Sequence, residues 1–256
     1  MFEEQLQFSE ALSLAQQLGF AESNPALDIE GYDAVNKWCI LLNHAYGIVQ
    51  KPYDILFTGI QNIQLDDAVV AREKNYEIKL VAQAQKLKNG KVAAFVLPQF
   101  IKQDEPLAFV KNEYNGVVIE SGFADKQFFY GKGAGSFPTA SAVLSDIAAL
   151  RYDYKYEYKK LYHHIPGTLT TDFYLNVYIS FDKYPTIPKE EFEYIEEYNS
   201  GKKRSYITGI IHFTKLIHNS FWKQDGASLI LLPDAIVETA EIKTAKKQRK
   251  ETSVEI

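Results

Sequence analysis

The chain has 256 residues, which is enough for one or two domains with a sizeable hydrophobic core. Hydrophobic residues make up 46% of it and aromatic residues 14%, a composition that excludes disorder over the whole chain. The formal net charge of −5 provides no overall positive field for a polyanion, so we expect no nucleic-acid partner. The single cysteine, Cys39, excludes an internal disulfide and a thiolate zinc cage, and it indicates a reducing compartment.

Neither the apolar runs nor the N-terminus is typical of a membrane or secreted protein. No run approaches the roughly 18 residues of a membrane span, and residues 1–5 lack the basic start of a signal peptide. We therefore expect a cytoplasmic location and no membrane partner. The histidines stand at no recognisable ligand spacing, so we expect no metal site.

The first 75 residues are predicted to be mainly helical. Apolar positions recur at helical spacing over 8–18, and Gly19 stands where a left-handed residue ends a helix. A polar stretch over 22–31 predicts a loop, and the pattern then predicts helices over 33–46 and 65–75.

Residues 76–150 are predicted to add a sheet and one further helix. β-branched and aromatic residues are enriched in four short runs, which predict strands over 78–82, 92–97, 117–120 and 127–130. The glycine-rich run 131–135 then leads into a helix predicted over 136–150. Helices and a sheet in one α+β domain are therefore expected over 1–150.

The composition changes after Leu150 to an aromatic and charged stretch, which we interpret as a linker over 151–170. The pattern beyond it predicts a strand over 173–181, a helix over 188–198, a strand over 205–213, a helix over 214–222 and a strand over 227–232. This alternation predicts a small α+β module over 171–240. Residues 241–256 are charged and nearly free of apolar side chains, so we expect a disordered tail.

Four charged residues in or beside the loop over 22–31 form the candidate site: Glu22, Asp28, Asp33 and Lys37. Asp33 and Lys37 are four residues apart on one predicted helix, so their side chains share a face. One interpretation is an exposed acid-base pair that stabilises the helix slightly. The other makes Lys37 a proton donor kept charged by carboxylates, while Glu22 and Asp28 bind an ammonium group of a substrate.

A longer pattern surrounds these four residues. Residues 10–37 contain E-A-L, A-Q, L-G-F-A-E, N-P and L-D-I-E-G-Y-D-A in order, and then Lys37. Further motifs follow at Gly59-Ile60, Ile78-Lys79-Leu80, Pro106 to Val110, Asn115, Gly131 to Gly135 and Pro138 to Val143. Together they resemble the catalytic domain of homoserine dehydrogenase over residues 1 to about 150. The resemblance implies helices packed on a mixed β-sheet.

The resemblance also implies roles for individual residues. Lys37 would be the catalytic proton donor, and Glu22, Asp33 and Asp28 would bind or surround the substrate. Gly19, Gly133 and Gly135 would approach the nicotinamide end of the cofactor, NADP or NAD. The implied reaction is the interconversion of L-aspartate 4-semialdehyde and L-homoserine by hydride transfer. The implied assembly is a homo-oligomer, either a dimer or a tetramer, with a dimer-forming sheet near 92–97 and 117–130.

The sequence departs from this family at its start, where no G-x-G-x-x-G phosphate loop follows a first strand. We therefore expect a fragment or one half of a split enzyme. Such a chain would fold, but it would need a nucleotide-binding domain in cis or in trans for turnover.

The segment over 171–240 is similar in layout to the ferredoxin-like ACT domains that end many bacterial members of the family. That similarity leaves a second function open, a non-catalytic regulatory or dimerisation subunit that binds an amino-acid effector such as threonine. Retention of Glu22, Asp33 and Lys37 favours the enzyme.

Overall fold

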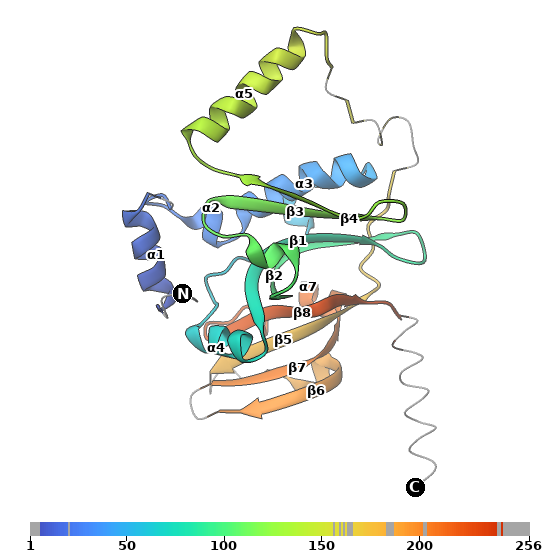
Figure 1. The fold of residues 1–256 in the computed structure, drawn as a ribbon. Coiled ribbons are helices and arrows are strands. Elements are labelled where there is room, and N and C mark those ends of the chain that lie inside the picture. Colours follow the sequence, from blue (N-terminus) through green and yellow to red (C-terminus); the bar gives the residue numbers. More distant parts are fainter. Residues whose placement is uncertain are drawn as a thin grey trace.

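The computed structural model describes residues 6–19, 21–155, 157–158, 160, 162, 166–182, 187–201, 204–239 and 242. Its strands form one six-stranded sheet and one two-stranded hairpin (Figure 1). The longer helices are α1 (Phe8–Gln17), α3 (Tyr32–Tyr46), α4 (Leu65–Glu73) and α5 (Ser136–Leu150), and the shorter ones are α2 (Ala26–Ile29) and α7 (Phe213–His218). Within the described ranges there are also three 3-10 turns, η1 (Pro52–Asp54), η2 (Pro106–Phe109) and η3 (Lys189–Glu191).

The six-stranded sheet is mixed, as the resemblance implied. Its spatial order is β1-β2-β8-β5-β7-β6, and β2 runs parallel to β8 while the other neighbouring strands are antiparallel. The strands are β1 (Tyr76–Lys86), β2 (Val92–Lys102), β5 (Tyr174–Asp182), β6 (Phe192–Ser200), β7 (Arg204–His212) and β8 (Ala227–Val237). The predicted helices packed on a mixed sheet are therefore confirmed.

Strand β2 lies inside the sheet because nearly every one of its residues is apolar. All of its residues except Lys102 are buried, so both of its faces are covered. Helix α3 covers one face, where Val35 and Leu42 pack with Val92 and Val96. Phe95 and Leu97 belong to the largest core cluster of the protein.

The remaining strands, β3 (Tyr114–Ser121) and β4 (Asp125–Lys132), pair with each other as an antiparallel hairpin. The rings of Tyr114 and Tyr130 stack across the pair with centroids 4.7 Å apart. The hairpin also keeps large apolar side chains exposed, among them Ile119 and Phe129.

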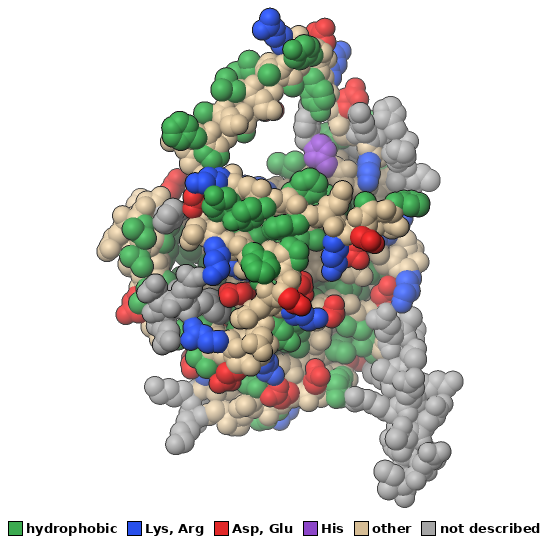
Figure 2. All heavy atoms as spheres, in the orientation of Figure 1, with side chains coloured by type: hydrophobic (Ala, Val, Ile, Leu, Met, Phe, Trp, Pro, Cys, Tyr) green, Lys and Arg blue, Asp and Glu red, His purple; other side chains and the backbone are tan. Residues whose placement is uncertain are grey.

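Helix α5 projects away from the rest of the chain (Figure 1) and has no buried residue. Apolar side chains are spread along it, as Figure 2 shows. Phe137 is 89% exposed and Leu150 is 67% exposed. Its bounds match the prediction over 136–150, although packing against the described residues contributes little to its stability.

The helix predicted over 188–198 is wrong, because this segment forms η3 and the edge strand β6. Its glutamates favour a helix locally, but its backbone pairs with β7 and Ile195 packs against the core. Glu197 accepts a 2.6 Å hydrogen bond from the hydroxyl of Tyr206 and pairs with Lys74 at 3.1 Å. Tertiary contacts therefore override the helical propensity.

The division at residue 150 needs a correction, because strands from both sides of it share one sheet. The parallel pairing of β2 with β8 crosses it, and so does the largest core cluster, which contains Phe95 and Phe173. The segment over 171–240 thus forms no sheet of its own, and the predicted ACT-like layout is not confirmed. The predicted tail over 241–256 lies outside the described residues except for Ile242, which is buried.

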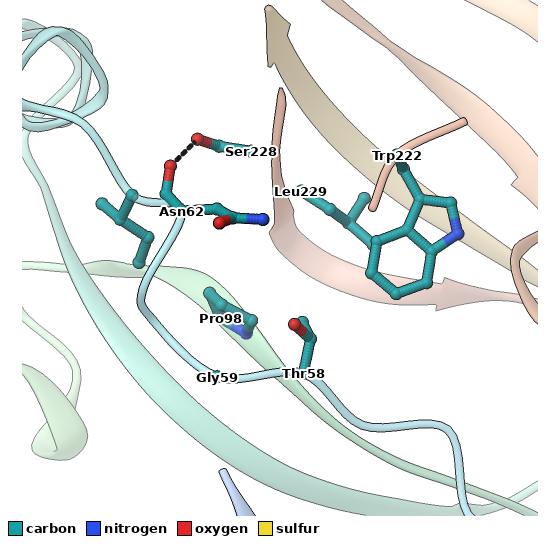
Figure 3. Close-up of a pocket in the computed structure, with 8 residues that line it drawn as sticks. Thr58, Gly59, Asn62, Pro98, Trp222, Ser228 and Leu229 are labelled. Carbon is teal, nitrogen blue, oxygen red and sulfur yellow. Dashed lines mark hydrogen bonds between the residues drawn. The ribbon is translucent and has the colours of Figure 1, made fainter. Parts of the chain in front are cut away.

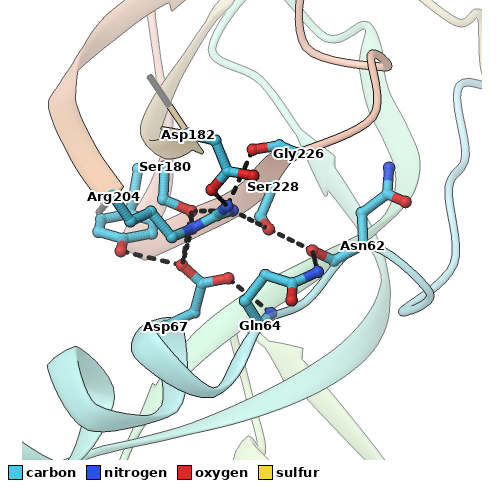
Figure 4. Close-up of polar contacts among 9 residues, drawn as sticks. Asn62, Gln64, Asp67, Ser180, Asp182, Arg204, Gly226 and Ser228 are labelled. Carbon is cyan, nitrogen blue, oxygen red and sulfur yellow. Dashed lines mark hydrogen bonds and ion pairs between the residues drawn. The ribbon is translucent and has the colours of Figure 1, made fainter. Parts of the chain in front are cut away.

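A polar cluster joins the two sides inside the molecule (Figure 4). The side chain of Asp67, at the start of α4, is fully buried and accepts hydrogen bonds from the hydroxyls of Tyr178 and Ser180 at 3.0 and 2.5 Å. The Arg204 guanidinium donates to Ser180 and Ser228, both from its Nη2 at 2.8 Å. Among the described residues, no helix combines the length and apolar character needed to cross a lipid bilayer.

Candidate active site

The α2–α3 corner positions three of the four candidate charged residues. Helix α2 carries Asp28, and Gly31 with a φ of +86° turns the chain into α3, which carries Asp33 and Lys37. A left-handed φ of this kind favours glycine, because a side chain would be strained there. The glycine therefore lets α3 begin a few residues after α2 ends, so their acidic residues, Asp28 and Asp33, are close in the sequence.

Asp33 and Lys37 form the ion pair that their spacing predicted. The Lys37 Nζ lies 2.7 Å from Asp33 Oδ2, and the two side chains are 58% and 45% exposed. The opposite face of α3 is anchored by Val35 and Leu42, which are fully buried. The helix is therefore held by its apolar face while the ammonium group stays accessible to a ligand.

Glu22 and Asp28 are both exposed and flank this helix in the sequence. The loop at Glu22 is tied to α1, because Gln16 Nε2 donates a 2.8 Å hydrogen bond to the Glu22 backbone oxygen. Within the part of the chain that the structure describes, neither carboxylate forms a hydrogen bond or ion pair. Both groups are thus available as acceptors for a cationic ligand.

The three candidate glycines lie in two separate segments of the structure. Gly19 follows α1 with a φ of +76°, and apart from its neighbours in the chain no described residue has an atom within 4 Å of the position that a Cβ would take. Gly133 and Gly135 follow β4, and Gly135 with a φ of +118° precedes α5. No hydrogen bond or ion pair among the described residues joins Gly133 or Gly135 to α1, α2 or α3.

Asn115 fixes the backbone next to Gly133. A Cβ on Gly133 would lie 2.0 Å from Asn115 Nδ2, so the amide of Asn115 fills the space of a side chain. The Gly133 N–H donates to the Glu113 oxygen at 2.9 Å. Lys132 lies 2.8 Å from the Glu113 carboxylate, and this hydrogen bond lowers the pKa of Glu113 and raises the pKa of Lys132.

Comparison with known proteins identifies the family of this chain. The family model of homoserine dehydrogenase matches residues 1–148, which is more than half of the chain. The chain belongs to the homoserine dehydrogenase family. The match extends from α1 into α5 and includes every candidate site residue.

Individual homoserine dehydrogenases agree with the family model. The chain is 39% identical over 150 residues to the protein of Lactococcus lactis and 43% identical over 147 residues to that of Helicobacter pylori. These matches cover 59% and 57% of this chain. The chain spans about a third of the length of these relatives, 35% of each.

A solved structure extends the likeness in fold beyond residue 150. The homoserine dehydrogenase of Thiobacillus denitrificans superposes with a TM-score of 0.73 and 24% identity, over 91% of this chain and 60% of that one. This comparison supports the fold alone. It covers strands on both sides of the predicted boundary, in agreement with the shared sheet.

Three residues of this region could not be assigned a structural role from the sequence. Gly59 and Asn115 stand in the motifs that carried the resemblance, but only the structure shows that each lies at a close approach between segments. Asp67 falls in the first turn of the helix predicted over 65–75, where an acidic residue is favourable, but the sequence does not indicate that its side chain is buried. Its Oδ2 accepts a 2.9 Å hydrogen bond from the Gln64 N–H at the start of α4, which is a local contact.

Proposed function

We propose that this chain supplies the catalytic region of a homoserine dehydrogenase. The reaction is the reversible interconversion of L-aspartate 4-semialdehyde and L-homoserine. The observation that carries the proposal is the accessible Asp33–Lys37 ion pair, at 2.7 Å, on a helix that the exposed residues Glu22 and Asp28 precede in the sequence. This arrangement offers one positioned proton donor and two acceptors for the ammonium group of an amino acid.

Lys37 is the proposed proton donor. When NAD(P)H is bound, it supplies the hydride that adds to the aldehyde carbon of the substrate. The carbonyl oxygen then gains negative charge, and the Lys37 ammonium stabilises that charge and transfers a proton to it. The Asp33 carboxylate orients the ammonium group. In the reverse direction, neutral Lys37 accepts the hydroxyl proton of homoserine.

Glu22 and Asp28 are the proposed ligands of the substrate ammonium group. Their carboxylates carry the complementary charge and have no partner among the described residues. A bound ammonium group fixes the substrate at one end, which orients its carbonyl towards Lys37.

The glycines support binding of the nicotinamide end of NADP or NAD. The open space around Gly19 and the absence of a side chain at Gly135 permit a planar ring to approach the backbone. Helix α5 begins without a side-chain cap, so its first N–H groups remain available to a polar acceptor. We therefore assign Gly19, Gly133 and Gly135 to the cofactor side.

The partner that we propose is a nucleotide-binding domain, in cis or in trans, in a homo-oligomer. The apolar residues of α5, including Phe137 and Leu150, support a surface that another unit covers. The exposed Ile119 and Phe129 of the hairpin support a second such surface. We expect turnover only from the assembled enzyme.

Replacement of Lys37 tests this function. In the chain assembled with a nucleotide-binding domain, Lys37→Ala should lower turnover by about 10²-fold or more, because general acid catalysis is lost. Its unfolding free energy should change by no more than about 1 kcal/mol, because the ion pair is exposed. The matched control is Lys74→Ala, because Lys74 is another exposed lysine in an ion pair, 3.1 Å from Glu197. This control should leave turnover unchanged. Unchanged turnover in Lys37→Ala would contradict the proposed role.

A further inference from the structure

The loop that contains Gly59 is fixed to the centre of the sheet. The Val96 N–H donates to the Leu56 oxygen at 3.0 Å, and the Thr58 N–H donates to the Val96 oxygen at 3.0 Å. Val96 belongs to β2 and is fully buried. The loop therefore has little freedom to move relative to the sheet.

The same loop contacts the turn between α2 and α3. The Ile60 N–H donates a 2.8 Å hydrogen bond to the Ile29 oxygen. A Cβ on Gly59 would stand 1.8 Å from that oxygen and 2.5 Å from the Glu30 carbonyl carbon. From the other side, a Cβ on Gly31 would lie 3.0 Å from the Thr58 oxygen. The two backbones are thus in direct contact, and only glycine fits at Gly59.

Residues after the predicted domain boundary at residue 150 also lie against this loop, on the far side of a small cavity. Figure 3 shows Trp222 facing Thr58 and Gly59 across a small cavity, whose volume of about 10 Å³ has room for about one water. Nearby, the Ser228 hydroxyl donates a hydrogen bond to the Asn62 oxygen. The loop is therefore confined between the sheet and the α2–α3 turn.

We propose that Gly59 is a positioning residue, which sets the place of Asp28 relative to the Asp33–Lys37 pair. The inference rests on the proposed function. Asp28 immediately precedes Ile29, and Asp33 lies two residues after Gly31, so the turn that Gly59 contacts links the two acidic residues. A methyl group at Gly59 would displace this turn by about 1 Å, and such a displacement at a binding site costs a large factor in affinity or rate.

Alanine at Gly59 tests the inference. The φ of Gly59 lies outside the left-handed region, so the backbone tolerates alanine and the clash with the turn is the main effect. We expect Gly59→Ala to weaken homoserine binding in calorimetry by at least about tenfold. Amide hydrogen exchange of Ile60 should accelerate, because its bond to the Ile29 oxygen is lost. If Gly59→Ala does not fold, Gly31→Ala serves as the test, because its Cβ approaches the same contact from the other side at 3.0 Å. It also strains the backbone at a φ of +86°, so its control is Gly90→Ala, where the φ is +82° and a Cβ meets nothing within 4 Å.

Two glycine controls separate positioning from general destabilisation. At Gly122 a Cβ would meet nothing within 4 Å, so Gly122→Ala should change neither stability nor binding. At Gly209 a Cβ would stand 2.2 Å from the Tyr194 oxygen in the β6–β7 pair, away from the α2–α3 turn. Gly209→Ala should therefore lower the midpoint of urea unfolding while the affinity for homoserine stays unchanged.

The outcomes distinguish this inference from the proposed function. If Gly59→Ala accelerates exchange at Ile60 but binds homoserine like the unaltered chain, the positioning role is overturned and the proposed function stands. If Gly209→Ala weakens homoserine binding as much as Gly59→Ala does, the effect is general destabilisation and the positioning role is again overturned. Absence of homoserine binding to the unaltered chain would overturn both.

Discussion

The Arg204 guanidinium and the Asp67 carboxylate form a buried ion pair, with Arg204 Nε 3.7 Å from Asp67 Oδ1. Their side chains are 7% and 0% exposed. Asp67 lies in α4 and Arg204 in β7, on opposite sides of residue 150 (Figure 4). Arg204 Nη1 also donates to Asp182 at 2.8 Å and to the Gly226 oxygen at 2.9 Å, so hydrogen bonds compensate much of the cost of burying its charge.

Removal of one partner of this pair should be strongly destabilising. Arg204→Met should lower the unfolding free energy by about 3–5 kcal/mol in urea titrations, because the Asp67 charge stays buried without its partner. A second substitution, Asp67→Asn, should recover part of this loss. The control is Lys102→Met, which breaks an exposed pair with Asp234 at 3.9 Å and should cost about 0.5 kcal/mol or less. A cost below about 1 kcal/mol for Arg204→Met would contradict the role of the pair.

Tyr178 should make stability fall at alkaline pH. Burial raises the pKa of this phenol above its ordinary value, and the nearby Asp67 carboxylate raises it further. A raised pKa in the folded state means that the unfolded chain loses the phenolic proton first. The stabilisation is therefore complete below about pH 10, the pKa of an exposed tyrosine, and is lost as the pH rises above it.

Tyr178→Phe tests this dependence on pH. At neutral pH it should lower the unfolding free energy by about 1–3 kcal/mol, because Asp67 loses a hydrogen-bond donor. Above about pH 10 its unfolding free energy should fall less steeply with pH than that of the unaltered chain. The difference between the two slopes should correspond to the release of one proton. Tyr53→Phe is the control, because Tyr53 is 73% exposed. Parallel stability curves for Tyr178→Phe and the unaltered chain would contradict the prediction.

Local signals predicted much of the fold. Helix α3 begins after Gly31 and ends before Gly47, two glycines with left-handed φ, and the apolar periodicity between them predicted it. The spacing of Asp33 and Lys37 predicted their ion pair in the same way. These features depend on neighbours within a few residues.

Other features depend on partners far along the chain, which one sequence does not reveal. The segment over 188–198 carries helix-forming glutamates, but pairing with β7 makes most of it a strand. Nothing in the local sequence of Asp67 indicates that Arg204 lies beside it. Gly59 stands in a motif, but its close approach to the Ile29 oxygen depends on the packing of two separate loops.

The shared core predicts that both sides of residue 150 unfold together. The ring of Phe173 stacks on Phe213 with centroids 4.3 Å apart and lies 6.4 Å from Phe95 of β2. Phe173→Ala should therefore lower the unfolding free energy of the whole chain by about 3–5 kcal/mol. Phe109→Ala is the control, because Phe109 is 64% exposed, and it should have little effect.

The two tryptophans provide the measurement, since Trp38 lies in α3 and Trp222 beyond residue 150. Trp38→Phe and Trp222→Phe variants each leave one fluorescent reporter. Phe173→Ala should shift the urea midpoint by the same amount in both single-tryptophan variants. In each of them, the change in tryptophan fluorescence should coincide with the loss of circular dichroism. Separate transitions, or a shift at Trp222 alone, would show two independent domains and contradict the shared core.

The most direct test of the account is a calorimetric titration of the chain with L-homoserine. The account predicts measurable binding that Glu22→Gln weakens by about tenfold or more, because the substrate ammonium group loses an ionic partner. Glu73→Gln removes another exposed glutamate, in α4, and should leave the affinity unchanged. Absence of homoserine binding, or binding that Glu22→Gln does not weaken, would contradict the account. Threonine binding that survives Glu22→Gln, without homoserine binding, would instead indicate a regulatory subunit.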